Sequence, residues 1–563
     1  MFNVVVPDMN RSGKGIDLKQ VLWISFPLFL LYATILFYPV NVSAEQGDGN
    51  PRLILIHVDG VGTKFLLEEA EKGNLPNLMN IFGEEGRIDH TITYFPSKTP
   101  TVISSIRDGV TPDMSSLAGW IQSDDQGGEV KGMVSTFIQM AFSKSRMATT
   151  NLIYGIPVMD RLAGLALQNT VTYLKDYDVL QYYWYKTDTH AHFYGEEAYR
   201  KQIKEFDRQI GKLVSRLPED VNLIIYSDHG ITFDEGIDLG DTVKRVIGSD
   251  LNAYSYPTLY LKNPGKREQH ARNLVDQTEI AVTFFKLNDY TVKGIHSDGE
   301  IYFREKDGEV KYEYEGYDLL KYQEYGYNGD YLNKDEWLEI SHLSDYPMAP
   351  INIYFFMQNR SSGDIITLLS PNQFNKTPYS KAGNHGGFHK NDMVTPLFAK
   401  GPDIEELYNR EKFWLPDLFS KLDQFDFKSE PQRDRHYLSH RFNFRSGTPV
   451  TELAFSPTYR VYYGADLYWD SDLKIDRTDV WGKADIFRSY LSRLWIGGGV
   501  EIDSESQYSP FFKLRYDLHI RSFVFKNSFA TNREFLFKIS YEVTPELAFE
   551  VTSFRSVGLR IDF

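Results

Sequence analysis

The chain has 563 residues, too many for one ordinary hydrophobic core, so we expect at least two domains. Its formal net charge of -16 argues against a nucleic-acid-binding protein that works through a basic face. The absence of cysteine excludes disulfide frameworks, thiolate metal sites and cysteine nucleophiles. Any bound metal must therefore be held by histidine and carboxylate groups.

The N-terminus has the pattern of an export signal. Two lysines precede an uncharged run over residues 21–40, and a small-residue sequence that ends at Ala44 resembles a cleavage site. We expect residues 1–44 to be a signal peptide and the rest of the chain to be exported. Because the run is long enough to span a bilayer, an uncleaved anchor is the alternative, although Pro27 and Pro39 within the run favour cleavage.

Two short apolar runs end in carboxylates. The run that begins at Leu53 is closed by Asp59, and the run that begins at Leu223 is closed by Asp228 and His229. Buried parallel strands have such continuous apolar runs, and ligands bind just outside their carboxyl ends. Either aspartate alone could be a helix cap or a turn residue. Because the pattern recurs, we expect this edge of the sheet to bind a cation.

Strand-like runs alternate with helical patterns from about residue 52 to residue 425, which predicts an α/β domain with a mostly parallel sheet flanked by helices. Helical patterns cover 65–82 (with a break at Asn74 and Pro76), 150–174 and 195–217, and a strand is expected over 179–184. Residues 286–345 are rich in Tyr, Glu, Lys and Gly, and we expect an inserted subdomain rich in hairpins there. The whole domain is expected to span residues 45–428.

Hydroxyl side chains stand directly before a helical pattern at Ser97, Thr99 and Thr101, and Pro100 suits the first turn of that helix. A helix N-terminus favours a phosphate group, and a hydroxyl there can attack if its pKa is lowered. The alternative is that Thr99 only caps the helix.

Histidines accompany two further motifs. Asp188 and His192 are four residues apart and would face one metal if the segment is helical, with His190 as the competing ligand. His385 lies in a glycine-rich loop, where the backbone can approach a ligand closely. Each motif alone could equally belong to an ordinary surface loop.

Taken in order, these motifs resemble the alkaline phosphatase superfamily, in particular its type I phosphodiesterase/nucleotide pyrophosphatase branch, over about residues 52–402. The resemblance implies an alkaline phosphatase-like fold and two divalent metal ions, expected to be Zn²⁺. It implies that one zinc is held by Asp59, Thr99, Asp228 and His229, with Thr99 as the nucleophile, and the other by Asp188, His192 and His385.

The resemblance implies a hydrolase of phosphoric esters that forms a covalent phospho-enzyme and acts on a phosphate-ester small molecule or a lipid head group, and the N-terminal signal implies that this hydrolase is exported. The chain departs from the family at Gly119-Trp120, where a phosphate-binding Asn is expected, at Lys186-Thr187, where Glu-Pro is expected, and at Phe388-His389-Lys390, which resembles phosphosugar mutases. A metal-dependent phosphosugar mutase and a non-catalytic outer-membrane binding protein are therefore the alternatives, and monoesters and diesters both stay open.

Residues 434–563 have a different pattern. Phe512, Leu514 and Tyr516 alternate with Lys513 and Arg515, which predicts antiparallel strands with one apolar and one polar face. Roughly eight such strands fit the segment, as in a small outer-membrane β-barrel, and the terminal phenylalanine resembles the last strand of such barrels. We expect the barrel to tether a periplasmic catalytic domain to the outer membrane; a soluble β-sandwich is the alternative.

Overall fold

The computed structural model describes residues 51–108, 110–115, 117–123, 130–136, 162–174, 177–427, 436–444, 447–458, 461–531, 533–544, 547–553 and 556–562. The predicted signal peptide lies outside these residues, as does the first half of the helix predicted over 150–174. Within these ranges, no helix is long and apolar enough to cross a membrane.

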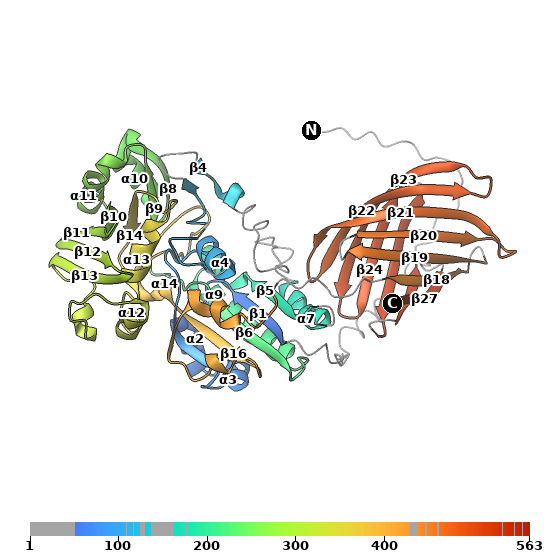
Figure 1. Ribbon diagram of the computed structural model, residues 1–563, viewed down its shortest axis with the longest axis horizontal. Helices are drawn as coiled ribbons and strands as arrows, with labels where there is room; N and C mark the ends of the chain where they lie inside the picture. The colour runs from blue at the N-terminus through green and yellow to red at the C-terminus, as the bar shows by residue number, and fades with distance from the viewer. Residues whose placement is uncertain are drawn as a thin grey trace. The chain divides into compact units, whose positions relative to one another are not determined.

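A six-stranded sheet forms the centre of the N-terminal part of the chain (Figure 1). Its strand order is β17 (Lys412–Trp414), β2 (Arg87–Ile92), β16 (Val394–Lys400), β6 (Val221–Ser227), β1 (Arg52–Val58) and β5 (Val179–Trp184). β16 is antiparallel to both of its neighbours, and all other neighbouring pairs are parallel. All strands except β16 therefore point the same way, which confirms the predicted mostly parallel sheet.

Helices cover both faces of this sheet because successive side chains of a strand point to opposite sides. In β1, Ile54 and Ile56 enter one hydrophobic core, whereas Leu53 and Leu55 enter another. The helices of this part are α2 (Thr63–Glu71), α3 (Pro76–Phe82), α4 (Thr99–Asp108), α7 (Ala163–Tyr173), α8 (Lys186–Tyr194), α9 (Glu196–Val214) and α14 (Lys390–Met393). The predicted break at Pro76 is confirmed, since it separates α2 from α3.

A second, antiparallel sheet of seven strands packs beside the first. Its order is β13 (Glu309–Gly316), β12 (Gly299–Lys306), β11 (Thr291–His296), β10 (Val282–Asn288), β14 (Ile365–Leu368), β9 (Thr258–Leu261) and β8 (Leu251–Ser255). Its helices are α10 (Leu239–Ile247), α11 (Arg267–Gln277), α12 (Lys334–Ser341) and α13 (Ala349–Gln358). Hairpins do occupy the stretch predicted as an insert, but the sheet they belong to begins at Leu251 and ends at Leu368, so this unit is larger than 286–345.

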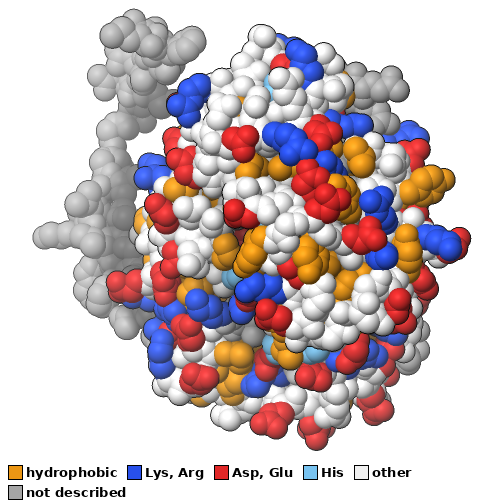
Figure 2. All heavy atoms as spheres, turned by 90° about the vertical axis from the view of Figure 1, so that its left-hand side faces the viewer, with side chains coloured by type: hydrophobic (Ala, Val, Ile, Leu, Met, Phe, Trp, Pro, Cys, Tyr) orange, Lys and Arg blue, Asp and Glu red, His pale blue; other side chains and the backbone are white. Residues whose placement is uncertain are grey.

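The two sheets share one core. Phe284 of β10 packs in a cluster that also contains Ile92 of β2 and Trp414 of β17. On the face of the molecule that carries β11–β13, acidic and basic side chains are interspersed, without a large patch of one sign (Figure 2). Several of them form ion pairs, such as Arg304 with Glu313.

The C-terminal part is a closed antiparallel barrel of ten strands. They are β18 (Tyr437–Asn443), β19 (Thr448–Thr458), β20 (Val461–Trp469), β21 (Ile475–Arg488), β22 (Ser492–Asp503), β23 (Tyr508–Ile520), β24 (Phe523–Ala530), β25 (Arg533–Glu542), β26 (Leu547–Thr552) and β27 (Ser556–Asp562). The barrel closes through the pairing of β18 with β27, where Tyr437 faces Asp562. The predicted count of about eight was too low because β18, β26 and β27 have only 6 or 7 residues each.

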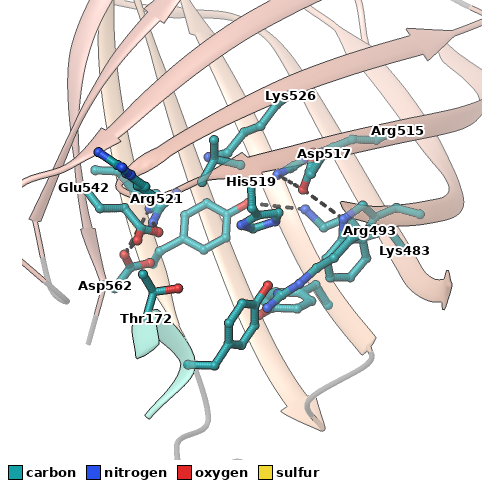
Figure 3. A pocket seen from close by; sticks show the side chains of 16 residues that line it. Thr172, Lys483, Arg493, Arg515, Asp517, His519, Arg521, Lys526, Glu542 and Asp562 are labelled. Carbon is teal, nitrogen blue, oxygen red and sulfur yellow. Dashed lines mark hydrogen bonds and ion pairs between the residues drawn. The ribbon is translucent and has the colours of Figure 1, made fainter. Parts of the chain in front are cut away.

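Many apolar side chains of the barrel strands are exposed and most charged ones point into the lumen (Figure 3), although Tyr462, Trp481, Trp495 and Phe511 form a buried aromatic cluster. Along β23, Phe512, Leu514 and Tyr516 are 43%, 38% and 38% exposed, whereas Asp517 is 3% exposed. Across the lumen, Lys538 of β25 contacts a carboxylate of β19, Glu452, at 3.1 Å. This distribution is the reverse of that in a soluble β-domain, whose apolar face would be buried.

Candidate metal centre

The residues predicted to hold metal lie together at the carboxyl edge of the first sheet. Asp59 follows β1, Asp228 and His229 follow β6, and Asp188 and His192 lie on α8, which follows β5. Thr99 is the first residue of α4, and His385 comes from the loop after β15 (Gln373–Asn375). All are buried except His192, which is partly exposed. Because parallel strands end at the same edge, segments more than 300 residues apart in sequence meet here.

Two glycines permit this close approach. Gly60 has a φ of +71°, and a Cβ atom there would lie 3.0 Å from the Cβ of Asp188. Gly386 has a φ of +110°, and a Cβ atom there would lie 3.0 Å from Cε of Lys98. Larger residues are disfavoured at both positions, which explains the glycines beside Asp59 and His385.

One group of donors surrounds Thr99. Its Oγ1 lies 3.4 Å from Oδ1 of Asp59 and 3.3 Å from Nε2 of His229. The same Nε2 lies 3.2 Å from Oδ1 of Asp59 and 3.4 Å from Oδ2 of Asp228. Asp59, Asp228 and His229 therefore offer three ligand atoms within 4.8 Å of one another.

A second group adjoins the first. Oδ1 of Asp188 lies 3.1 Å from Nε2 of His192 and 3.6 Å from Nε2 of His385. The predicted helix over this motif is confirmed as α8, so the i, i+4 spacing brings Asp188 and His192 together. The rings of His229 and His385 stack with their centroids 3.5 Å apart. His229 thus also lies within 4.8 Å of ligand atoms of Asp188 and His385, at the junction of the two groups.

The three histidines are oriented as metal ligands are. Nδ1 of His192, His229 and His385 lies 2.9, 2.9 and 2.5 Å from the carbonyl oxygens of Gly383, Gly230 and Ser97, respectively. A carbonyl oxygen can only accept, so each Nδ1 carries the proton and each Nε2 presents a lone pair to the site. Backbone carbonyls fix metal-binding histidines in this way.

The carboxylates also present free lone pairs. Among the described residues, Oδ1 of Asp188 and Oδ2 of Asp228 are buried and make no hydrogen bond of good geometry. Burial, together with the neighbouring carboxylates Asp228 and Asp188, raises the pKa of Asp59 well above its usual range. Burial alone would lower the pKa of His229, but Asp228 and Asp59 raise it to about 10. Without a metal ion, the raised pKa values of Asp59 and His229 favour their protonated forms, and a divalent cation would replace those protons.

The donor set therefore fits divalent cations. Oxygen and imidazole ligands without thiolate suit zinc and similar ions, and Asp188, His192 and His385 make a three-ligand group that would leave a position open for substrate. His190, the competing candidate, turns its Nδ1 to the carbonyl of Lys186 at 2.8 Å, whereas Nε2 of His192 lies 3.1 Å from Oδ1 of Asp188.

Sequence reasoning missed the residues that hold these ligands. His57, which precedes Asp59 on β1, stacks on Tyr226 and places its Nε2 3.2 Å from Oδ1 of Asp228. Tyr183 donates a hydrogen bond to the carboxylate of Asp59. The sequence feature that could have revealed His57 is the presence of a histidine within an otherwise apolar strand run. Lys98 beside Thr99 is 8% exposed, and burial lowers its pKa to about 7.

The departures from the family pattern have structural roles here. Thr187 donates a hydrogen bond to the carbonyl of Asp59. Phe388 stacks on Tyr346, and His389 caps α14 by accepting a hydrogen bond from the amide of Asn391. The loop that resembles phosphosugar mutases therefore serves packing and capping.

One comparison with known proteins finds a matching family model. The model of the type I phosphodiesterase / nucleotide pyrophosphatase family matches residues 115–388, which excludes Asp59, Thr99 and the barrel. A search of curated proteins found no significant match.

Similar solved structures include murine ectonucleotide pyrophosphatase / phosphodiesterase 5, with 15% identity and a TM-score of 0.43 over 66% of this chain and 94% of that chain. An inactive form of the same murine protein in complex with AMP has 14% identity and a TM-score of 0.44 over 68% and 96% of the two chains. The family model carries the comparison: residues 115–388 match the type I phosphodiesterase/nucleotide pyrophosphatase family of the alkaline phosphatase superfamily, and this match supports a phosphoric ester hydrolase.

Proposed function

We propose that this protein is an exported two-metal hydrolase of phosphoric esters, with Thr99 as its nucleophile. The observation that carries the proposal is the convergence of Asp59, Asp228 and His229 around the Thr99 hydroxyl, with Asp188 and His385 alongside. One cation would be held by Asp59, Thr99, Asp228 and His229, and the other by Asp188, His192 and His385. The donor types favour Zn²⁺.

When bound, two such ions supply charge that lowers the pKa of a coordinated hydroxyl and stabilises the attacking and leaving oxygens of the ester. The protein itself contributes by holding the Thr99 hydroxyl and the histidine ligand atoms in place. Thr99 begins α4, so its hydroxyl stands at the positive end of a helix whose first amides can hold phosphoryl oxygens. The carbonyl-bound histidines keep each Nε2 directed at the site.

The reaction would have two displacements. Thr99 Oγ1 loses its proton to water and forms a bond to phosphorus while the bond from phosphorus to the ester oxygen breaks, and the leaving alcohol gains a proton from water. Water then attacks the phosphothreonine, which restores the Thr99 hydroxyl and releases phosphate, or a phosphate monoester if the substrate is a diester. A phosphosugar mutase would instead return the phosphoryl group to a sugar; the matching family consists of hydrolases, which favours transfer to water.

We propose further that residues 45–428 form the catalytic domain, that residues 434–563 form a barrel in a bacterial outer membrane, and that residues 1–44 are a cleaved signal peptide. The apolar outside and charged lumen of the barrel support this. Because the strand number is even and Tyr437 faces Asp562, the chain enters and leaves at one end of the barrel. That end would face the periplasm, where the substrate would be a phosphate-ester small molecule or a lipid head group.

The first prediction concerns the nucleophile. Thr99→Ala should retain bound metal and fold but lose at least ~10³ in turnover of bis-p-nitrophenyl phosphate or p-nitrophenyl phosphate, because no hydroxyl remains to attack. The ratio of the two wild-type rates also reports whether diesters or monoesters are preferred. Thr101→Ala, two residues along the same helix, is the matched control and should keep its rate. If the Thr101 variant is inactive and the Thr99 variant is active, the nucleophile is Thr101 and the assignment of Thr99 is wrong.

The second prediction concerns the ligands. Asp228→Asn and His385→Ala should each lower the metal content, measured by elemental analysis, and the catalytic rate. Each substitution removes one of the three ligand atoms in a candidate metal-binding group. His190→Ala should change metal content far less than His192→Ala. If the His190 variant loses the metal and the His192 variant keeps it, the ligand assignment on α8 is wrong.

The third prediction concerns the barrel. Full-length protein should fractionate with outer membranes, need detergent for extraction, and migrate differently on gels before and after boiling, because its outer face is apolar. The same chain without residues 434–563 should be released as periplasmic enzyme. Full-length protein that stays in solution without detergent, with migration unchanged by boiling, would contradict membrane insertion.

A further inference from the structure

Ser97 lies two residues before Thr99, and the proposed reaction does not use its side chain. The residue is completely buried. Its hydroxyl donates a hydrogen bond to the carbonyl oxygen of Gly387 at 2.9 Å and accepts one from the amide of Gly386 at 3.0 Å. Both partners belong to the glycine-rich loop that carries His385. The hydroxyl is therefore engaged as donor and as acceptor, and it joins two loops rather than facing a substrate.

The backbone of Ser97 makes a third bond to the same loop. Nδ1 of His385 donates a hydrogen bond to the carbonyl oxygen of Ser97 at 2.5 Å. The carbonyl thus sets the direction of the imidazole, while the hydroxyl fixes the two residues that follow it. All three bonds are buried and join residues 288 to 290 positions apart in the sequence. Buried polar networks whose members are all satisfied hold their partners rigidly.

The glycine-rich loop is also anchored to the segment that follows His229. The backbone amide of Thr232 donates a hydrogen bond to the carbonyl of Asn384 at 2.9 Å, and its hydroxyl donates one to Oδ1 of Asp392 at 2.8 Å. Oδ2 of Asp392 accepts a hydrogen bond from the amide of Gly387 at 2.9 Å. Hydrogen bonds therefore fasten this loop both to the segment of the proposed nucleophile and to a segment that carries a ligand of the other cation.

We propose that Ser97 is a positioning residue that aligns the imidazole of His385 with the Thr99 hydroxyl. The inference rests on the proposed function, because Ser97 has this task only if Thr99 attacks the ester and His385 holds a cation. Groups that orient a metal ligand without touching the metal change its affinity by about 10- to 100-fold. Ser97 thereby links the segment of the nucleophile directly to a ligand of the second cation.

Removal of the Ser97 hydroxyl should loosen one cation and leave the other in place. In Ser97→Ala, the amide of Gly386 and the carbonyl of Gly387 lose a buried partner, so the loop is held less firmly. The cation assigned to the group that contains His385 should then bind more weakly. The ligands beside Thr99 belong to other segments and should retain their cation.

The test is a zinc titration of the full-length protein in detergent, after EDTA treatment, with free zinc set by a chelator. Zinc content and turnover of the preferred p-nitrophenyl ester are measured at each point. Ser97→Ala should need at least ~10-fold more free zinc to fill its weaker site. At limiting zinc its kcat should fall by a similar factor, and excess zinc should restore kcat with KM unchanged, because Thr99 and all seven ligands are present.

Two variants serve as comparisons. Ser97→Thr keeps the hydroxyl and should fill both sites at the free zinc that suffices for the wild type. Ser105→Ala, on the same segment, also removes a buried hydroxyl that is bonded to a backbone carbonyl, and should titrate as the wild type does.

Ser97→Ala that fills both sites at wild-type free zinc, or that stays inactive at excess zinc, overturns the assignment of Ser97. A defect that Ser97→Thr shares in full also overturns it, because the hydroxyl would then not be what matters. Wild-type protein that binds no zinc, or Thr99→Ala with full activity, would instead refute the proposed function itself.

Discussion

The structure depends on one electrostatic constraint: three buried carboxylates lie side by side with imidazoles at one edge of the first sheet. Asp59, Asp188 and Asp228 are at most 3% exposed, and His229 lies between them. Burial of several anions side by side is costly unless a cation joins them. The glycines, the carbonyl acceptors of the histidines and the strand order all bring these groups together, which is the arrangement that the proposed metal binding requires.

Much of the fold could be predicted because it follows from local patterns. Apolar runs that end at Asp59 and Asp228 are buried parallel strands, and the spacing of Asp188 and His192 is that of a helix. The second sheet was only partly predicted, because its strands are drawn from 251 to 368 and pair across long sequence separations. The strand count of the barrel failed for a related reason, since short strands such as β26 carry too few residues for alternation to be visible.

The candidate ligands could be predicted as a set, but the residues that position them could not. His57 lies within an apolar strand run, and only the folded sheet shows that its ring reaches Asp228. The carbonyl oxygens of Ser97 and Gly383 that orient His385 and His192 have no sequence signature, because every residue carries a carbonyl. The barrel shows the same limit: alternation revealed two faces, but only closure shows that the charged face is the inner one.

The central claim is that the seven ligand residues hold two cations around Thr99. Anomalous X-ray diffraction at the zinc edge, from crystals of the zinc-loaded protein, tests it most directly. The account predicts two peaks roughly 4 Å apart, one bonded to Asp59, Thr99, Asp228 and His229 and the other to Asp188, His192 and His385. A single peak, or active protein with no peak among these residues, would contradict it.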